Sequence, residues 1–67
     1  MYYLTLINET DHAIDLTETH DTQEAAASRF RAYELTAELE TRDTGKVWRA
    51  VLDDKPFEWP VEPVEPS

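Results

Sequence analysis

The chain has 67 residues, no cysteine and a single glycine, and its 15 acidic and six basic residues give a formal net charge of −9 at pH 7. This length allows one domain that buries only about 60% of its unfolded surface. The absence of cysteine excludes disulfides and thiolate chemistry. The charge disfavours direct binding to nucleic acid or anionic membranes, because both are negatively charged.

The sequence also lacks the signals of export or membrane insertion. No basic start is followed by an apolar run of signal-peptide length, and no stretch approaches the roughly 20 apolar residues of a membrane span. We therefore expect a cytoplasmic protein. Three origins of the acidic charge stay open: solubility, adaptation to high salt in a halophile, and mimicry of a polyanion that occupies a basic protein surface.

The beginning of the chain predicts a β-hairpin. Residues 2–8 are rich in aromatic and β-branched side chains, which favour strands, and residues 12–17 alternate between apolar and polar side chains. Residues 8–11 supply turn-forming side chains between them. The register that places both apolar sets on one face pairs Leu6 with Ile14 and Leu4 with Leu16.

A helix is predicted from about residue 22 to residue 32 or 33. Asp21 or Thr22 can cap its first backbone amides, and Glu24 lies at capping-box distance from Asp21. Three consecutive alanines follow, and alanine is the strongest helix former. An apolar stripe at helical spacing would face the core, with Phe30 as its main anchor between Ala26 and Tyr33.

Residues 33–53 predict a second hairpin. Leu35, Ala37 and Leu39 alternate with polar residues, which is typical of a strand with one buried face. Gly45 follows two turn-forming residues, where a chain reversal needs a positive φ. A three-residue turn with a glycine bulge is the alternative to the favoured register. That register pairs Asp43 with Lys46, Glu40 with Arg49, Leu39 with Ala50 and Ala37 with Leu52.

The predicted fold is an α+β domain of ββαββ topology over residues 1–54, in which a four-stranded, mainly antiparallel sheet carries the helix on one face. Residues 55–67 contain all four prolines and repeat Val-Glu-Pro, which predicts an extended Pro-rich tail. The second face of the sheet would then expose Tyr3, Ile7, Val47 and Val51.

Phe57 and Trp59 lie two residues apart in this tail and would project to the same side of an extended chain. Two interpretations stay open. The pair could fold back over the bare sheet face or the helix edge, or it could form a peptide motif offered to another protein.

Side chains suited to catalysis or metal binding are few. Ser28 and Ser67 have neither a nearby base nor a glycine-rich oxyanion loop. His20, Asp21 and Glu24 could together hold a divalent cation, but helix capping already accounts for the two carboxylates. We therefore expect no enzymatic activity, no metal site and no cofactor.

Carboxylates are the main candidate binding feature. Alternate residues of a strand recur at about 6.8 Å, close to the spacing of successive phosphates on one nucleic acid strand. An acidic sheet edge could therefore mimic a row of phosphates, although Arg42 and Arg49 would interrupt it. Together with the aromatic pair, the candidate partner-binding residues are Asp15, Glu18, Glu38, Glu40, Asp53, Asp54, Phe57 and Trp59.

In size and composition the chain resembles the small acidic proteins of bacteriophages and mobile elements, which often block a host protein. The leading hypothesis is accordingly a non-catalytic module, such as an inhibitor or nucleic-acid mimic, that binds another protein with a basic surface. The alternative is a structural homodimer joined through the open sheet face or through edge strands.

Overall fold

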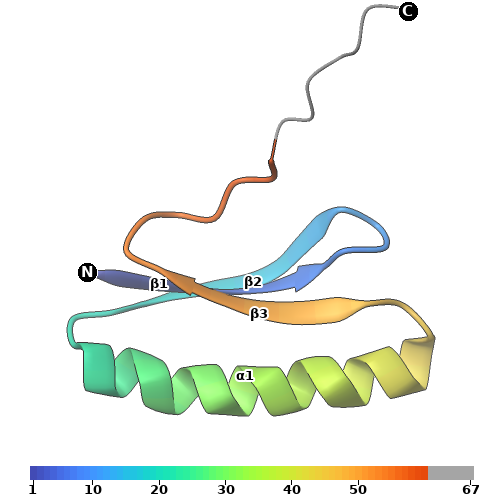
Figure 1. The fold of residues 1–67 in the computed structure, drawn as a ribbon, viewed down its shortest axis with the longest axis horizontal. Coiled ribbons are helices and arrows are strands. Elements are labelled where there is room, and N and C mark those ends of the chain that lie inside the picture. Colours follow the sequence, from blue (N-terminus) through green and yellow to red (C-terminus); the bar gives the residue numbers. More distant parts are fainter. Residues whose placement is uncertain (61–67) are drawn as a thin grey trace, which may run out of the picture.

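The sheet has strand β1 at its centre. The computed structural model describes residues 1–60, which form strands β1 (Tyr2–Asn8) and β2 (Ala13–His20), helix α1 (Gln23–Thr44) and strand β3 (Trp48–Asp53). Both β2 and β3 pair with β1 in antiparallel orientation, so the strand order is β2-β1-β3. Helix α1 lies along one face of this sheet, which makes an α+β fold (Figure 1).

The prediction of a four-stranded ββαββ domain is wrong, because residues 33–42 continue the helix instead of forming a third strand. Within the described residues only β3 follows the helix, and it pairs with β1. The register predicted for the second hairpin is therefore wrong as well, including its Glu40–Arg49 pair. Arg49 instead forms an ion pair with Glu9, with 2.6 Å between Arg49 Nε and Glu9 Oε1.

The helix continues because its buried stripe does not stop at Tyr33. Ala37 is buried one turn later, and both residues belong to the same core cluster. Leu35 and Leu39, whose alternation predicts a strand, are instead 58% and 53% exposed on the other side of the helix. Residues 33–42 thus carry a period of two and a period of 3.6, and burial follows the second.

Both ends of α1 are capped. Thr22 is the N-cap, one of the two caps that the sequence predicts, and its Oγ1 accepts a hydrogen bond from Ala25 N at 3.2 Å. At the other end Gly45 has a φ of 74°, in the left-handed region, and its N–H donates to Thr41 O at 3.0 Å. The sequence therefore identifies the residue that needs a positive φ, but this glycine ends a helix rather than turning a hairpin.

The first hairpin forms in a different register from the predicted one. Its turn is longer than expected and includes His12 at a φ of 51°. A bulge between Leu6 and Ile7 then shifts the pairing of β1 with β2. The observed pairs that replace the predicted ones are Leu6–Leu16, Leu4–Glu18 and Ile7–Ile14.

The core lies between α1 and the sheet. Phe30, the predicted anchor, is only partly buried at its margin, whereas Tyr33 is 5% exposed and lies within it. The alanines of α1 allow the helix to approach the sheet closely, so Tyr33 supplies most of the helix's buried volume. The buried cluster consists of Leu4, Leu6, Tyr33, Ala37 and Ala50, with Phe30, Trp48 and Leu52 packed against it.

Gly45→Ala tests the cap at the end of α1. We expect the free energy of unfolding to fall by about 1–2 kcal/mol, because a Cβ disfavours the left-handed conformation. No heavy atom lies within 4 Å of the position of that Cβ, so the loss would be conformational rather than steric. Urea denaturation measures it. Gly45→Asn is the control and should lose less, since asparagine tolerates a positive φ; equal losses would contradict this account.

Candidate functional site

Residues 54–60 cover part of the face of the sheet opposite α1. Thr5 and Ile7 point to this face, since they alternate along β1 with core residues Leu4 and Leu6, yet they are only 1% and 0% exposed. In Figure 1 the chain after β3 runs back over the sheet on the side away from the helix. The face that the sequence predicts to be open is therefore partly covered.

Phe57 and Trp59 form an aromatic cluster with His12. The ring centroids of Phe57 and Trp59 lie 5.0 Å apart in an edge-to-face arrangement, and the Trp59 ring stacks on the His12 imidazole at 4.8 Å with an interplanar angle of 8°. Both aromatic residues of the tail are half-buried. The contact that Trp59 makes is with the turn before β2 rather than with the helix edge, and both interpretations of the aromatic pair stay predictions.

A double-mutant cycle on His12 and Trp59 tests this contact. His12→Asn keeps a residue that tolerates the positive φ, and we expect it to lower the free energy of unfolding by about 0.5–1.5 kcal/mol through loss of stacking. Combined with Trp59→Ala it should cost less than the two single losses added together, because the two residues share one interaction. Thermal denaturation of the four proteins gives the coupling, and additive losses would contradict the stacking.

Glu18 of β2 joins the sheet to the helix. Its Oε1 accepts a hydrogen bond from Arg29 Nε at 3.0 Å and lies 2.7 Å from His20 Nε2. Its Oε2 accepts a hydrogen bond from the Tyr33 hydroxyl at 2.6 Å. The Arg29 guanidinium also lies over the Tyr33 ring, 5.5 Å from its centroid. One carboxylate therefore holds two residues of α1.

These contacts stabilise the ionised form of Glu18. The hydrogen bond from Arg29 has the largest effect, followed by the one from Tyr33, and they lower the pKa of Glu18 from 4.5 to about 2. Burial, and then the hydrogen bond to Glu18, raise the pKa of Tyr33 to about 12. Glu18, a predicted partner-binding residue, thus has an internal role between strand and helix.

Glu18→Gln should lower the free energy of unfolding at pH 7 by about 1–3 kcal/mol, because it removes hydrogen bonds to a charged group. The folded-state pKa lies below the unfolded one, so this contribution is complete above about pH 4.5 and is lost as the pH falls toward 2. Urea unfolding at a series of pH values should show wild type and variant converging below pH 4.5. The exposed Glu34→Gln is the control; a constant gap would contradict the assignment.

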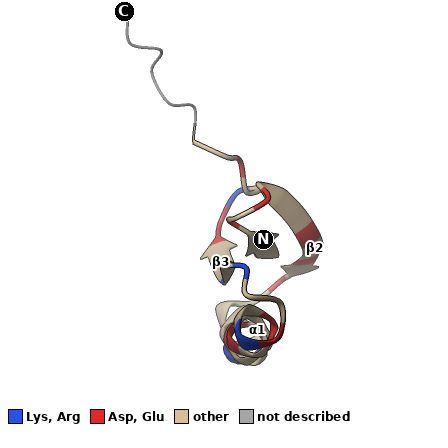
Figure 2. Cartoon of the chain, turned by 90° about the vertical axis from the view of Figure 1, so that its right-hand side faces the viewer, with Lys and Arg blue, Asp and Glu red and all other residues tan. Residues whose placement is uncertain are grey.

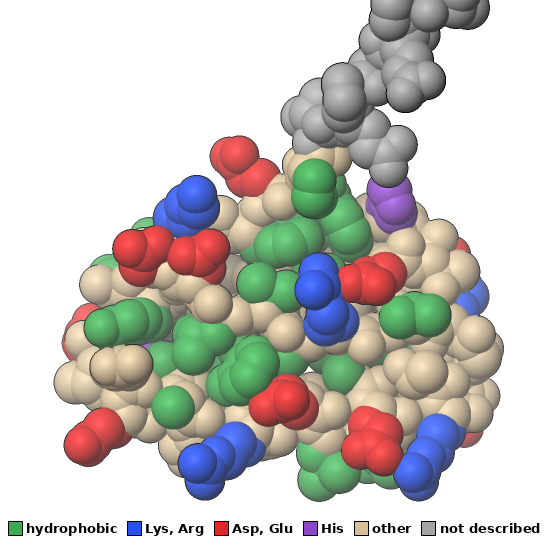
Figure 3. Space-filling view, viewed as in Figure 1, with side chains coloured by type: hydrophobic (Ala, Val, Ile, Leu, Met, Phe, Trp, Pro, Cys, Tyr) green, Lys and Arg blue, Asp and Glu red, His purple; other side chains and the backbone are tan. Residues whose placement is uncertain are grey.

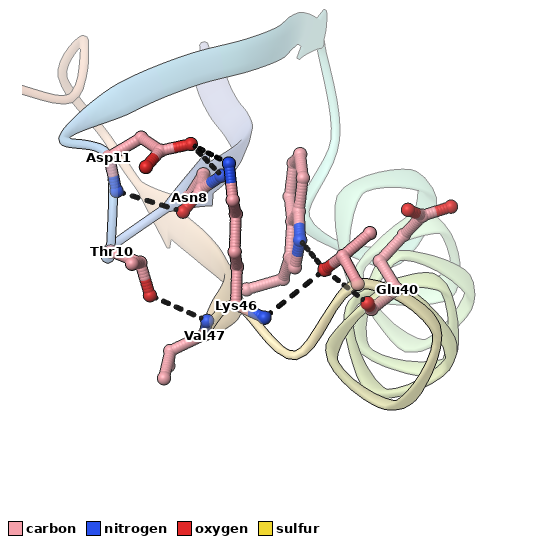
Figure 4. A network of polar contacts seen from close by, with 8 residues as sticks. Asn8, Thr10, Asp11, Glu40, Lys46 and Val47 are labelled. Atoms are coloured by element: carbon pink, nitrogen blue, oxygen red, sulfur yellow. Dashed lines mark hydrogen bonds and ion pairs between the residues drawn. The ribbon is translucent and has the colours of Figure 1, made fainter.

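A second polar network fixes the turn between β1 and β2 against the end of α1 (Figure 4). Lys46 Nζ donates to Asp11 Oδ2 at 2.6 Å, although the two residues are 35 positions apart in the sequence. The Thr44 hydroxyl donates to the backbone carbonyl of Glu40 at 2.7 Å and accepts from the Trp48 indole at 3.2 Å. The network therefore connects three elements and belongs to the scaffold.

The predicted carboxylates do not form a row that resembles phosphates. Glu38 and Glu40 lie in α1, where residues two apart do not face each other, and Glu38 pairs with Arg42 at 2.9 Å. Glu18 faces α1, whereas Asp15 is exposed on β2. Acidic residues are distributed over both the sheet and the helix (Figure 2).

Four carboxylates do gather at one end of the molecule. The start of β1 pairs with the ends of β2 and β3, at Tyr2–His20 and Tyr3–Asp53, and α1 begins just after β2. Acidic side chains accordingly lie along the left-hand end in Figure 3. We call this group the acidic end; it consists of Asp21, Glu24, Asp53 and Asp54.

The acidic end is only partly anticipated by the sequence. Asp53 and Asp54 are among the predicted partner-binding residues, whereas Asp21 and Glu24 are expected only to cap the helix. All four are exposed, and none of them forms an ion pair within residues 1–60. Knowledge of the strand order would have revealed this group, because β1 pairs with both β2 and β3 and so brings the ends of those two strands to the same end of the molecule.

Residues 1–60 contain no group of three or more metal-ligating side chains, so His20, Asp21 and Glu24 do not make a metal centre there. No helix in that part of the chain is both long enough and apolar enough to cross a membrane. Comparison with known protein families, curated proteins and solved structures finds no match.

Proposed function

We propose that the chain is a non-catalytic domain that binds another protein, with its acidic end directed toward a basic surface on that partner. The observation that carries this proposal is the unpaired charge of Asp21, Glu24, Asp53 and Asp54. Some other carboxylates are neutralised within the chain, as in the pairs of Arg29 with Glu18 and of Arg42 with Glu38. The exposed Glu34 and Asp43 form no ion pair within residues 1–60 either, but they lie nine positions apart along α1.

Complementary charge favours rapid and specific association rather than large contact area. The acidic end combines carboxylates from two chain reversals, so their positions relative to each other are fixed by the sheet. A protein surface that normally binds phosphates has the matching chemistry. Inhibition of a nucleic-acid-binding protein, including one of a bacteriophage host, would follow from occupying such a surface.

Reversal of charge at the acidic end tests the proposal. The double variant Asp53→Lys, Asp54→Lys should lose capture of the partner from an extract of the source cells, because it replaces attraction by repulsion. The double variant Glu34→Lys, Asp43→Lys makes the same change in charge on exposed residues of α1 and should retain capture. Circular dichroism checks that both variants are folded.

Salt and competition sharpen this test. Raising salt from roughly 0.1 M to 1 M shortens the screening length from about 10 to 3 Å, so capture should weaken. Duplex DNA added in excess should displace the chain if it occupies a phosphate-binding surface. Equal capture by the two double variants, or capture that does not respond to salt, would contradict binding through the acidic end.

A further inference from the structure

The outer edge of β3 presents unpaired backbone groups. Glu9 N donates to Val47 O, so Val47 and every second residue after it direct their N–H and C=O groups toward β1. The register between the two strands is regular and has no bulge. Ala50 and Leu52 therefore direct their N–H and C=O groups away from β1, and neither N–H has a partner among residues 1–60.

Side chains close the edge on both sides of these two residues. Trp48 N donates to Thr41 Oγ1 at 3.1 Å, and Asp54 N donates to Asp53 Oδ1 at 2.7 Å. Lysine and proline, which protect many natural edge strands, are absent from β3. The open part of the edge is therefore short and regular, as strand addition by an extended segment requires.

An open groove of about 220 Å³ lies beside this part of the edge, between α1 and β3. Its lining includes Ala37 of α1 and both Trp48 and Ala50 of β3. β3 is the strand nearest the viewer in Figure 1, and Figure 3 shows apolar side chains gathered on the same side of the molecule. Because both alanines are small, the groove has room for one apolar side chain of a bound segment.

Charges along β3 favour basic residues at one end of such a segment. Asp53 and Asp54 of the acidic end lie where the strand ends, and neither forms an ion pair within residues 1–60. Arg49 lies near the start of the strand and pairs with Glu9. Opposite charges across two strands attract and like charges repel, so a cation fits opposite Asp53 and not opposite Arg49.

We infer that the edge of β3 binds an extended segment of a protein partner by antiparallel strand addition, with basic residues at the amino-terminal end of the segment and an apolar residue at its centre. Antiparallel pairing places the first residues of the segment opposite Asp54 and Asp53, and a later one opposite Ala50. The side chain opposite Ala50 points to the same face of the sheet, toward the groove and α1.

This inference rests on the proposed function for the basic character of the partner, and it adds the form in which the partner presents its charge. Main-chain hydrogen bonds to Ala50 and Leu52 provide affinity, whereas the acidic end and the groove select side chains. The site therefore prefers an unpaired, extended segment to a folded basic surface.

Other occupants match the edge less well. A second copy carries a formal charge of −9, so it meets repulsion at the acidic end. Residues 61–67 contain Pro63 and Pro66, which cannot donate to a strand ladder, and the carboxylates of Glu62 and Glu65. A basic segment of another protein has neither disadvantage.

Three synthetic peptides of equal charge test the pairing on the full chain. The first, acetyl-Lys-Lys-Val-Thr-Leu-Thr-Thr-amide, can place its lysines opposite Asp54 and Asp53 and its leucine opposite Ala50. The second carries N-methyl groups on the valine and leucine amides, which face β3. The third carries them on the first two threonine amides, which face away from β3.

Fluorescence anisotropy of the labelled peptides measures their affinities. The second peptide should bind at least about tenfold more weakly than the first, because it loses two hydrogen bonds to β3. The third should bind like the first, since its methyl groups lie on the free edge of the added strand. All three keep the same side chains, so a difference between the second and third reports main-chain pairing.

Amide hydrogen exchange locates the bound peptide. In the free chain we expect Ala50 and Leu52 to exchange faster than Arg49 and Val51, whose amides are bonded to β1. Saturation with the first peptide should slow exchange at Ala50 and Leu52 at least about tenfold, because hydrogen-bonded amides exchange only after local opening. The charge-reversed variant Asp53→Lys, Asp54→Lys should lose this protection.

The outcomes separate this inference from the proposed function. Equal binding by all three peptides, no binding of the first, or unchanged exchange at Ala50 and Leu52 would overturn strand addition. Capture of the partner through the acidic end would then still stand or fall by its own charge-reversal test. Protection of Ala50 and Leu52 that persists in the charge-reversed variant would instead support the pairing and contradict binding through the acidic end.

Discussion

Strand β1 imposes the main constraint on this structure, because it is buried on both faces. Leu4–Asn8 is an uninterrupted run of five buried residues, although the sequence suggests a sheet with one wet face. Such a strand needs cover on each side and a paired strand along each edge. Helix α1 covers one face and β2 and β3 occupy the edges. Residues 54–60 cover part of the other face (Figure 1).

The small domain meets this demand with few large side chains. Of the two aromatic residues of α1, only Tyr33 is buried, and its hydroxyl also donates a hydrogen bond to Glu18. The helix therefore contributes apolar volume and a polar attachment through one residue. Glu18 in turn remains ionised because Arg29 and Tyr33 both donate to it. The packing of Tyr33 on β1 is therefore coupled to the charge of Glu18, a residue of β2.

The sequence predicts local features of this fold better than it predicts the pairing of its elements. The N-cap at Thr22 and the positive φ at Gly45 depend on single residues and their neighbours, and both are present. The third strand was wrong because Leu35, Ala37 and Leu39 fit two periods, and only tertiary contacts show that Ala37 alone is buried. The hairpin register was wrong because a bulge leaves no clear mark in the apolar pattern.

The candidate sites show the same difference between local features, which the sequence predicts, and contacts between distant elements, which it does not. Glu18 and the aromatic pair were identified as unusual residues, but their contacts with Arg29 and His12 depend on register and on a chain reversal that composition does not encode. The acidic end was missed in part because it combines two segments separated by about thirty positions. Its proposed role rests on charge and exposure rather than on any motif.

The pairing of β1 with β3 also has a consequence for synthesis on the ribosome. Tyr3 lies opposite Asp53, so the central strand cannot obtain its second neighbour until residues 48–53 have left the exit tunnel. The hairpin and the helix can form earlier, because their contacts are local. Until β3 arrives, a nascent chain would expose one edge and one apolar face of β1. Slow translation of the segment that follows the helix would therefore prolong the stage at which this domain is most prone to aggregate.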